Sequence, residues 1–356
     1  MPFALVRGAR LNYLQVDEPQ HHAHGGPRED LIMVHGLAAN MAFWYLPYAQ
    51  AFARRFRVTL FDLRGHGRSE LTADGYSPQG LGQDLLGLMD ELGIRRAHFV
   101  AHSFGGVVAL NAACREPSRV ASLVLCDSHI SAARRHATPR EWGRRAYVQS
   151  VLDRHGLALD THDPYFGSRL LTEVAHLQLR HEPVGEDLMK LVGPILGRHG
   201  KRSASQWVKL MDETTAGTEL MGDDGLALDA LRRLLFPILA LYGDHSQARL
   251  TGGDLLEVWP HGEFRRVRDA GHFFPVSRPD DVMHECERFW RGDYARRPIV
   301  RSGEEQRRHF RSDRVFKIDG AWHFSTRERG HVGPYATPDE AHEALARYIS
   351  DMAVTV

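Results

Sequence analysis

The chain has 356 residues, of which 43% are hydrophobic and 25% charged, a normal balance for a globular protein with ample material for a core. Lys and Arg together number 45, as do Asp and Glu, so the formal net charge is zero. This balance argues against a general nucleic-acid binder, which needs a basic excess to neutralise phosphates. The three cysteines, Cys114, Cys126 and Cys286, are scattered and form no CxxC pair, so we expect a reduced, cytoplasmic compartment.

The amino-terminal segment, MPFALVRGARLNYLQV, alternates polar and apolar residues and lacks the apolar stretch typical of a signal peptide. No apolar run approaches the ~20 residues needed to cross a bilayer, so we expect no membrane association. Histidines cluster at residues 20–26, QHHAHGG, in a stretch rich in Gly and Pro without partner cysteines. This pattern favours a solvated hairpin loop over a metal site.

Strand-like and helix-like segments alternate through the first third of the chain. A hairpin is expected over residues 3–16, with its turn near Gly8. Short apolar runs typical of buried strands lie at 31–36, 57–62, 98–103 and 119–127. Helical spacing is present at 42–54, 77–93 and 104–117. Strands alternating with helices predict an α/β fold with a mostly parallel sheet and helices on both faces.

The alternation then stops, and helical patterns dominate from about residue 130 to residue 235. Strand-like segments return at 236–243 and 263–269, and a last helix is expected over 280–292. The helical block is therefore predicted to be an insertion that forms a cap. This interpretation divides the core into residues 1–129 and 236–292.

The composition becomes highly charged after Gly292, which predicts a linker over 293–312. Residues 313–328 indicate a hairpin that turns at Asp319-Gly320. Residues 337–352 have the spacing of an amphipathic helix with Thr337 as N-cap and Pro at its first position. We expect a small ββα-like module over 313–356 that serves in docking, in dimerisation or as a support for a lid.

A candidate nucleophile lies in VAHSFGG, residues 100–106, which follows a predicted strand and opens a predicted helix. The motif is Gly-x-Ser-x-Gly with Ala101 in the first position. A serine on such a turn is forced outward at the top of the sheet, and small neighbours are needed because the strained backbone passes close to other elements. The helix N-terminus behind Ser103 favours negative charge on a developing oxyanion.

Backbone N–H groups for that oxyanion are expected from the turn after an earlier strand, in VHGLAAN, residues 34–40. The predicted donors are the N–H groups of Leu37 and of Phe104, the residue after the nucleophile. The side chain of Leu37 can also form an apolar pocket wall.

A candidate general base lies in RDAGHFFPVSRPDDV, where Gly271-His272 falls in the loop between the last strand and the last helix. A base in this loop can reach back over the sheet to Ser103. The chain order, serine before histidine, favours catalysis over a structural role for His272.

Four segments, HGLAAN, FDLRGHGRS, AHSFGG and DAGHFFP, in this order and on these strands, resemble the α/β-hydrolase superfamily. The resemblance covers about residues 3–291 and includes a helical cap. It implies acyl transfer through an acyl-enzyme on Ser103, with no cofactor and no metal. An Asp nucleophile would have implied dehalogenase or epoxide hydrolase chemistry. The chain most resembles the capped esterase, thioesterase and C–C hydrolase branches.

The triad acid departs from the family pattern. In many members the carboxylate lies about three residues after the Gly that ends the seventh strand, but this count from Gly243 reaches Ser246, followed by Gln247. Asp244 is close, although it directly follows the Gly and can serve as a turn residue. Other members place the acid after the sixth strand, where this chain has Asp127. We favour Asp127 and keep Asp244 as the alternative.

Several aromatic residues could line an acyl pocket, namely Trp44, Tyr45, Phe104 and Trp142, although each is also a candidate core residue. The arginines of residues 134–145 could receive the phosphate of a phosphopantetheine arm or an acidic carrier protein, with a solvated helix face as the alternative.

The sequence thus predicts a serine hydrolase that cleaves an ester or thioester. Its expected partner is a small-molecule acyl substrate, either free or bound to a carrier protein or coenzyme A. A C–C bond hydrolase, an acyltransferase or cyclase, and a non-catalytic ligand-binding fold remain the alternatives, and the oligomeric state stays open.

Overall fold

The computed structural model describes residues 2–17, 28–131, 139–161, 163, 166–192, 200–220, 222–246, 248, 255, 257–292, 315–318, 321–326 and 330–353. The chain divides into two compact units, residues 1–298 and 299–356. The predicted histidine-rich loop at 20–26 and the predicted linker at 293–312 lie outside the described residues.

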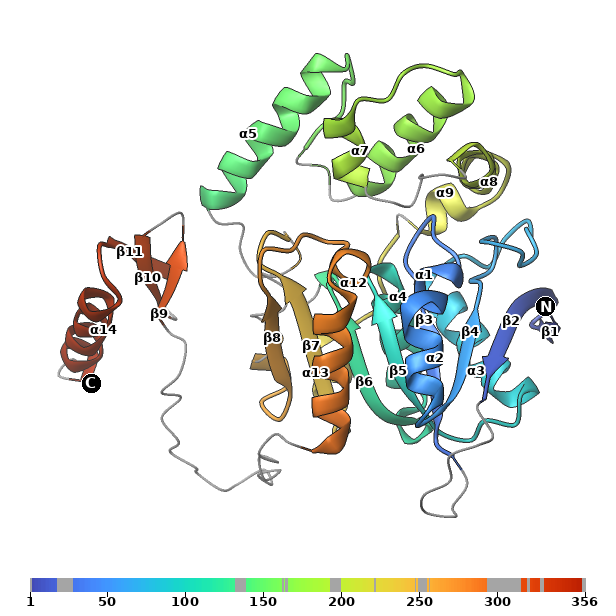
Figure 1. Ribbon diagram of the computed structural model, residues 1–356, viewed down its shortest axis with the longest axis horizontal. Coiled ribbons are helices and arrows are strands. Elements are labelled where there is room, and N and C mark those ends of the chain that lie inside the picture. Colours follow the sequence, from blue (N-terminus) through green and yellow to red (C-terminus); the bar gives the residue numbers. More distant parts are fainter. Residues whose placement is uncertain are drawn as a thin grey trace. The chain divides into compact units, whose positions relative to one another are not determined.

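An eight-stranded sheet forms the centre of the first unit (Figure 1). Its strands are β1 Phe3–Val6, β2 Ala9–Val16, β3 Asp30–Val34, β4 Arg57–Phe61, β5 Ala97–His102, β6 Val120–Cys126, β7 Ile238–Gly243 and β8 Glu263–Val267. The order is β1-β2-β4-β3-β5-β6-β7-β8. All neighbours from β4 to β8 are parallel, whereas β2 pairs antiparallel with β1 and β4. The predicted mostly parallel sheet is therefore confirmed.

Hydrophobic side chains of the strands divide between the two faces of this sheet. Along β3, Leu31 and Met33 belong to one buried cluster, and Ile32 and Val34 belong to another, because successive side chains point to opposite faces. The helices α3 Pro78–Glu91 and α4 Phe104–Arg115 pack on one face, and α2 Gln50–Ala53 and α13 Pro279–Arg291 pack on the other. The sheet is thus covered on both faces, which suits its parallel strands.

The helix expected over residues 42–54 is interrupted. It consists of α1 Ala42–Trp44, the wider turn η1 Tyr45–Ala49 and α2. Leu46 is extended, with φ −116° and ψ 127°, because the residue before a proline is disfavoured in the helical region and Pro47 follows it.

The cap region contains the helices α5 Pro139–Arg154, α6 Phe166–Leu179, α7 Glu186–Val192, α8 Gly200–Glu213, α9 Ala216–Glu219 and α10 Leu228–Arg232, most of them above the sheet in Figure 1. The amide of Gln206 on α8 donates to the carbonyl oxygens of Gly65 and Gly67, at 3.2 and 2.9 Å. The carboxylate of Glu219 accepts a hydrogen bond from the N–H of Ser77, at 2.7 Å. These contacts attach the cap to the loop after β4 and to the start of α3.

The second unit contains β9 Val315–Ile318, β10 Ala321–Thr326, β11 Gly330–Tyr335 and α14 Pro338–Ala353. Its strands form an antiparallel sheet in the order β11-β10-β9. The hydroxyl of Thr337 accepts from the N–H of Glu340 at 3.2 Å, as the predicted N-cap requires. The strand β11 was not expected, because its sequence GHVGPY contains two Gly and one Pro, which are poor strand formers. The predicted turn at 319–320 falls outside the described residues.

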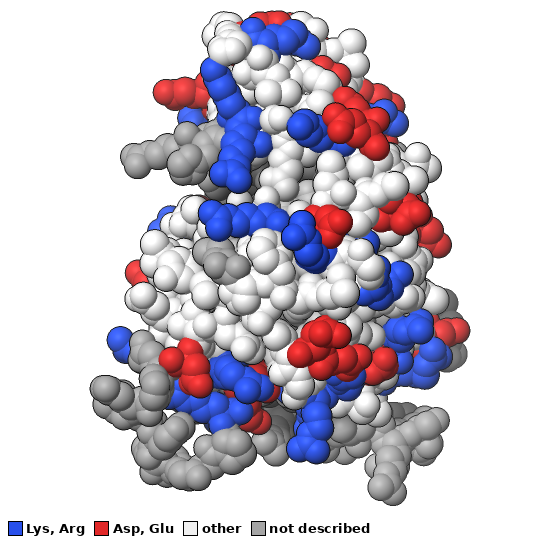
Figure 2. Space-filling model, turned by 90° about the vertical axis from the view of Figure 1, so that its right-hand side faces the viewer, with Lys and Arg blue, Asp and Glu red and all other residues white. Residues whose placement is uncertain are grey.

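Charged side chains of both signs are interspersed on the face of the molecule shown in Figure 2. Within the described ranges, no helix is both long enough and apolar enough to cross a bilayer.

Candidate active site

Ser103 occupies a sharp turn between β5 and α4. Its φ of 55° and ψ of −125° lie in a region that side-chain-bearing residues rarely adopt, and such strain is typical of a nucleophile elbow. A Cβ added at Gly105 would lie 2.5 Å from the carbonyl oxygen of His35, so only glycine fits at this position. Ala101 lies on β5, two residues before Ser103, and is fully buried between β3 and β6, where its small side chain is accommodated.

The structure brings Ser103, His272 and Asp127 together from three distant parts of the chain. His272 Nε2 lies 3.0 Å from Ser103 Oγ, and His272 Nδ1 lies 2.7 Å from Asp127 Oδ2. A carboxylate accepts hydrogen bonds, so the proton is assigned to Nδ1, and Nε2 is left to accept the proton of the serine hydroxyl. This arrangement can abstract that proton when the serine attacks a carbonyl carbon.

Asp127 is fully buried directly after β6, and the end of the neighbouring strand β7 and the loop after it supply its other hydrogen bonds. The N–H of Gly243 donates to Oδ1 at 3.0 Å, and the hydroxyl of Ser246 donates to Oδ2. Ser246 thus occupies the position after β7 at which an acid was sought in the sequence, and it instead donates to the carboxylate that follows β6. This role of Ser246 was not predicted, because nothing in the sequence indicates that a side chain of the loop after β7 contacts the residue that follows β6.

Asp244 lies one residue beyond the same strand, and its N–H donates to the carbonyl of Val267 at 3.0 Å. Both ring nitrogens of His272 are engaged by Ser103 and Asp127, so Asp244 is not a partner of that ring in this structure.

The predicted oxyanion donors lie beside the nucleophile. A Cβ added at Gly36 would lie 3.1 Å from the Cβ of Ser103, so the turn that carries Leu37 passes directly by the serine. Phe104 is the first residue of α4, where N–H groups have no partner within the helix. Among the described residues, neither the N–H of Leu37 nor that of Phe104 has a protein acceptor. Both groups are therefore free to bind an oxyanion.

The turn before Leu37 is held by His35, a residue that the sequence analysis did not single out. His35 Nδ1 donates to the carbonyl oxygen of Gly36 at 2.8 Å, and Nε2 accepts from the N–H of Leu63 at 3.0 Å. Burial lowers the pKa of His35, which keeps the ring neutral and able to make both bonds.

The residues predicted to line an acyl pocket differ in how far they are buried. Trp44 is fully buried, with its ring edge-on to Phe43 and Tyr48, and it belongs to the hydrophobic core. Tyr45 is 38% exposed on η1. The side chain of Trp142 and those of the arginines in 134–145 lie outside the described part of the structure.

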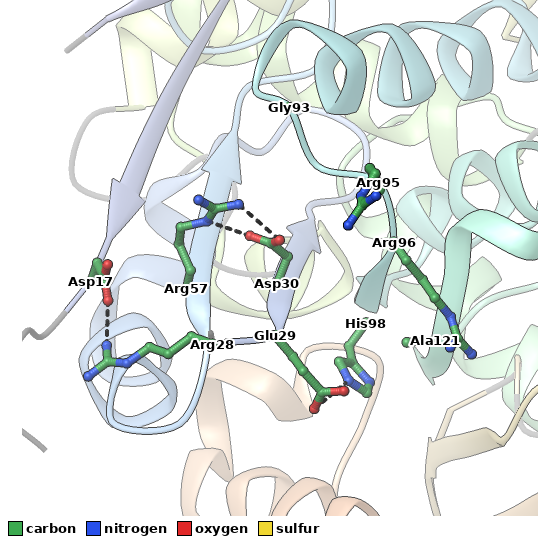
Figure 3. A pocket seen from close by; sticks show the side chains of 10 residues that line it. All are labelled: Asp17, Arg28, Glu29, Asp30, Arg57, Gly93, Arg95, Arg96, His98 and Ala121. Atoms are coloured by element: carbon green, nitrogen blue, oxygen red, sulfur yellow. Dashed lines mark hydrogen bonds and ion pairs between the residues drawn. The ribbon is translucent and has the colours of Figure 1, made fainter. Parts of the chain in front are cut away.

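A separate pocket of about 520 Å³ lies at the opposite ends of the strands (Figure 3). Its walls include Asp30 and Arg57, the first residues of β3 and β4, and His98 near the start of β5, whereas Ser103 follows the last residue of β5. Most of its charges are paired, as Arg57 is with Asp30 and Arg28 is with Asp17. This pocket is distinct from the candidate active site.

Comparison with known proteins supports the α/β-hydrolase fold. Residues 31–279 match the family model of the alpha/beta hydrolase fold. The chain belongs to this α/β-hydrolase family. Residues 300–354 match a second family, a domain of unknown function (DUF6316), which corresponds to the small module predicted at the carboxyl end.

Individual relatives of this α/β hydrolase are named as hydrolases. A protein named carbamate hydrolase RutD, from Caulobacter sp. (strain K31), is 40% identical over 147 residues, which are 38% of this chain and 54% of that protein. The chain thus spans about half the length of that curated relative. A pimeloyl-[acyl-carrier protein] methyl ester esterase from Serratia marcescens is 29% identical and covers 74% of this chain and 95% of its own. The enol-lactonase from Burkholderia xenovorans LB400 superposes with a TM-score of 0.53 at 25% identity and covers 82% of this chain and all of its own.

Proposed function

We propose that this hydrolase cleaves a carboxylic ester or thioester through a covalent acyl-enzyme on Ser103. The observation that carries the proposal is the hydrogen-bonded series Asp127–His272–Ser103, with distances of 2.7 and 3.0 Å. A serine is a weak nucleophile at its ordinary pKa, and an adjacent base oriented by a carboxylate is the arrangement that activates it.

In the proposed reaction, His272 Nε2 takes the hydroxyl proton as Ser103 Oγ attacks the carbonyl carbon. The negative charge moves to the carbonyl oxygen, which the N–H groups of Leu37 and Phe104 bind. The intermediate collapses, the bond to the leaving group breaks, and His272 returns the proton to the departing alcohol or thiol. A water molecule, activated by the same imidazole, then attacks the acyl-enzyme and releases the acid and the free serine.

The relatives favour a carboxylic ester as the substrate. The esterase from Serratia marcescens, similar over 74% of this chain, is named for hydrolysis of a methyl ester. The resemblance to a protein named carbamate hydrolase covers 38% of the chain, and a carbamate, like an ester, has a leaving group bonded to a carbonyl carbon. Both names fit a reaction in which an acyl group is transferred to a serine.

A hydrolysis screen tests the proposal, with p-nitrophenyl esters and matched acyl-thioesters of graded chain length. We expect turnover of short esters and a loss of kcat of about 10⁶ in Ser103→Ala, the size seen when a serine triad acts as a unit. A loss of only tenfold in correctly folded Ser103→Ala would show that another group is the nucleophile.

A further inference from the structure

His102, the last residue of β5, touches the loop that carries the proposed base. Its side chain is buried, with 2% of the residue's surface exposed, and its Nε2 lies 2.9 Å from the backbone carbonyl oxygen of His272. A carbonyl oxygen only accepts, so Nε2 of His102 must carry the proton. The residue immediately before the nucleophile therefore donates a hydrogen bond to the backbone of the base.

The ring of His102 lies close to two other rings. The Phe43 ring stacks on it at a centroid distance of 4.7 Å and an interplanar angle of 21°, and the ring of His272 lies 4.8 Å away. Burial, and then the nearby His272, hold the pKa of His102 well below its ordinary value of 6.5. His102 thus remains a neutral donor and adds no positive charge beside His272.

Other contacts hold the loop on either side of His272. The N–H of His245 donates to the carbonyl of Ala270 at 2.9 Å, and the hydroxyl of Tyr48 donates to the carbonyl of Pro275 at 2.6 Å. Asp127 orients the ring of His272 but not its backbone. Within the part of the chain that the structure describes, His102 is the only hydrogen-bond donor to the carbonyl of His272.

We propose that His102 is a positioning residue that fixes the backbone of His272 and so maintains the distance from Nε2 to Ser103. The inference rests on the proposed function, because it assigns His102 an effect through the base. A small displacement of a reacting group is costly: about 1 Å of misplacement can lower a rate by about 100-fold.

The test compares two amides that differ by one methylene group. In His102→Gln the amide nitrogen reaches as far as Nε2 and can still donate to the carbonyl, whereas in His102→Asn it ends at the level of Nδ1. We expect His102→Gln to keep kcat on the best ester within about threefold of the wild type. We expect His102→Asn and His102→Leu to lose about 10- to 100-fold in kcat with KM changed less than about threefold.

A double-mutant cycle separates positioning from a general structural role. In the His272→Ala background, His102→Leu should lower the residual activity by less than about twofold, because the group that it positions is already gone. His102→Asn replaces His102→Leu in this cycle if the latter does not fold.

Equal activities of His102→Gln and His102→Asn would overturn the proposal. So would a full, additive loss in the His272→Ala background, or loss of the fold in both the Asn and Leu variants. If the wild type itself shows no serine-dependent turnover, the proposed function fails first, and the two failures are thereby distinguished.

Discussion

A buried carboxylate needs hydrogen-bond donors around it, because removal of its charge from water is costly. Asp127 is fully buried and receives three donors, namely the N–H of Gly243, the hydroxyl of Ser246 and Nδ1 of His272. Two of these donors come from the last residue of β7, Gly243, and from the loop that follows it, Ser246. At this scale, the loop after β7 therefore supports a triad whose acid lies after β6.

Asparagine substitutions at the two aspartates test this assignment. Asp127→Asn should leave the fold largely intact and favour the wrong tautomer of His272, with a loss in kcat on the order of 10⁴ by analogy with other serine triads. Asp244→Asn is the matched control, and it should cost less than about tenfold because asparagine preserves most of the hydrogen bonding of a turn aspartate. Steady-state kinetics on one ester measures both, and the reverse order would assign the acid to Asp244.

The chemistry of individual residues was predictable from the sequence only where a local motif carries it. Ser103 follows from five residues on a strand–turn–helix pattern, and the position of His272 follows from Gly-His before the last helix. The contacts of Ser246 with Asp127 and of His102 with the loop at 272 join residues more than 100 positions apart. Such contacts depend on how loops close over the sheet, and no periodic pattern encodes them.

At the scale of secondary-structure elements, side chains of the helix α8 connect the cap to the core through hydrogen bonds and an apolar contact. The amide of Gln206 donates to the carbonyls of both Gly65 and Gly67, and the side chain of Leu210 lies beside Gly65. Apolar periodicity in the sequence predicted the strands and the cap helices. It did not predict these attachment points, because a single glutamine on a helix face gives no indication of its partner. The break at Leu46 was encoded locally, by Pro47.

Gln206→Ala should therefore loosen the cap. Loss of two hydrogen bonds, each contributing about 0.5–1.5 kcal/mol, predicts a decrease in the free energy of unfolding of about 1–3 kcal/mol. Lys209→Ala is the matched control, because this exposed residue lies on the same helix. Urea unfolding measures both, and equal stabilities of the two variants would show that Gln206 does not attach the cap.

At the scale of the whole molecule, several buried histidines link stability to pH. The pKa values of His35, His66, His98 and His102 are all lowered, chiefly by burial, and that of His66 falls to about 4. Between pH 6.5 and 4 the unfolded chain takes up protons that the folded protein excludes. The free energy of unfolding should therefore fall as the pH drops through this range, by about 1.4 kcal/mol per pH unit for each such proton.

His66→Asn isolates one of these contributions. Its amide can replace the donor that His66 Nδ1 provides to the carbonyl of Arg64 at 2.9 Å, but it does not titrate. Urea unfolding at several pH values between 4 and 6.5 gives the free energy of unfolding as a function of pH. The slope of this dependence should be smaller in His66→Asn than in the wild type, by an amount equivalent to up to about one proton. An unchanged slope would show that His66 does not exclude a proton in the folded state.

The division into two units predicts that the first one suffices for the proposed chemistry. A chain that ends at Gly292 retains Ser103, His272 and Asp127 as well as the whole of α13. We expect it to fold and to hydrolyse a small generic ester with kcat/KM within about threefold of the full chain. Truncated protein that is soluble and folded, as judged by circular dichroism, but inactive would make the carboxyl-terminal module part of the active site.

The central claim is that Ser103 is a nucleophile activated by His272, and covalent labelling with a fluorophosphonate tests it most directly. Intact-mass spectrometry of the folded protein should show one adduct, and peptide mapping should place it on Ser103. The adduct should be absent from Ser103→Ala and should form much more slowly in His272→Ala. Absence of an adduct on folded wild-type protein, or an adduct that persists in Ser103→Ala, would contradict the claim.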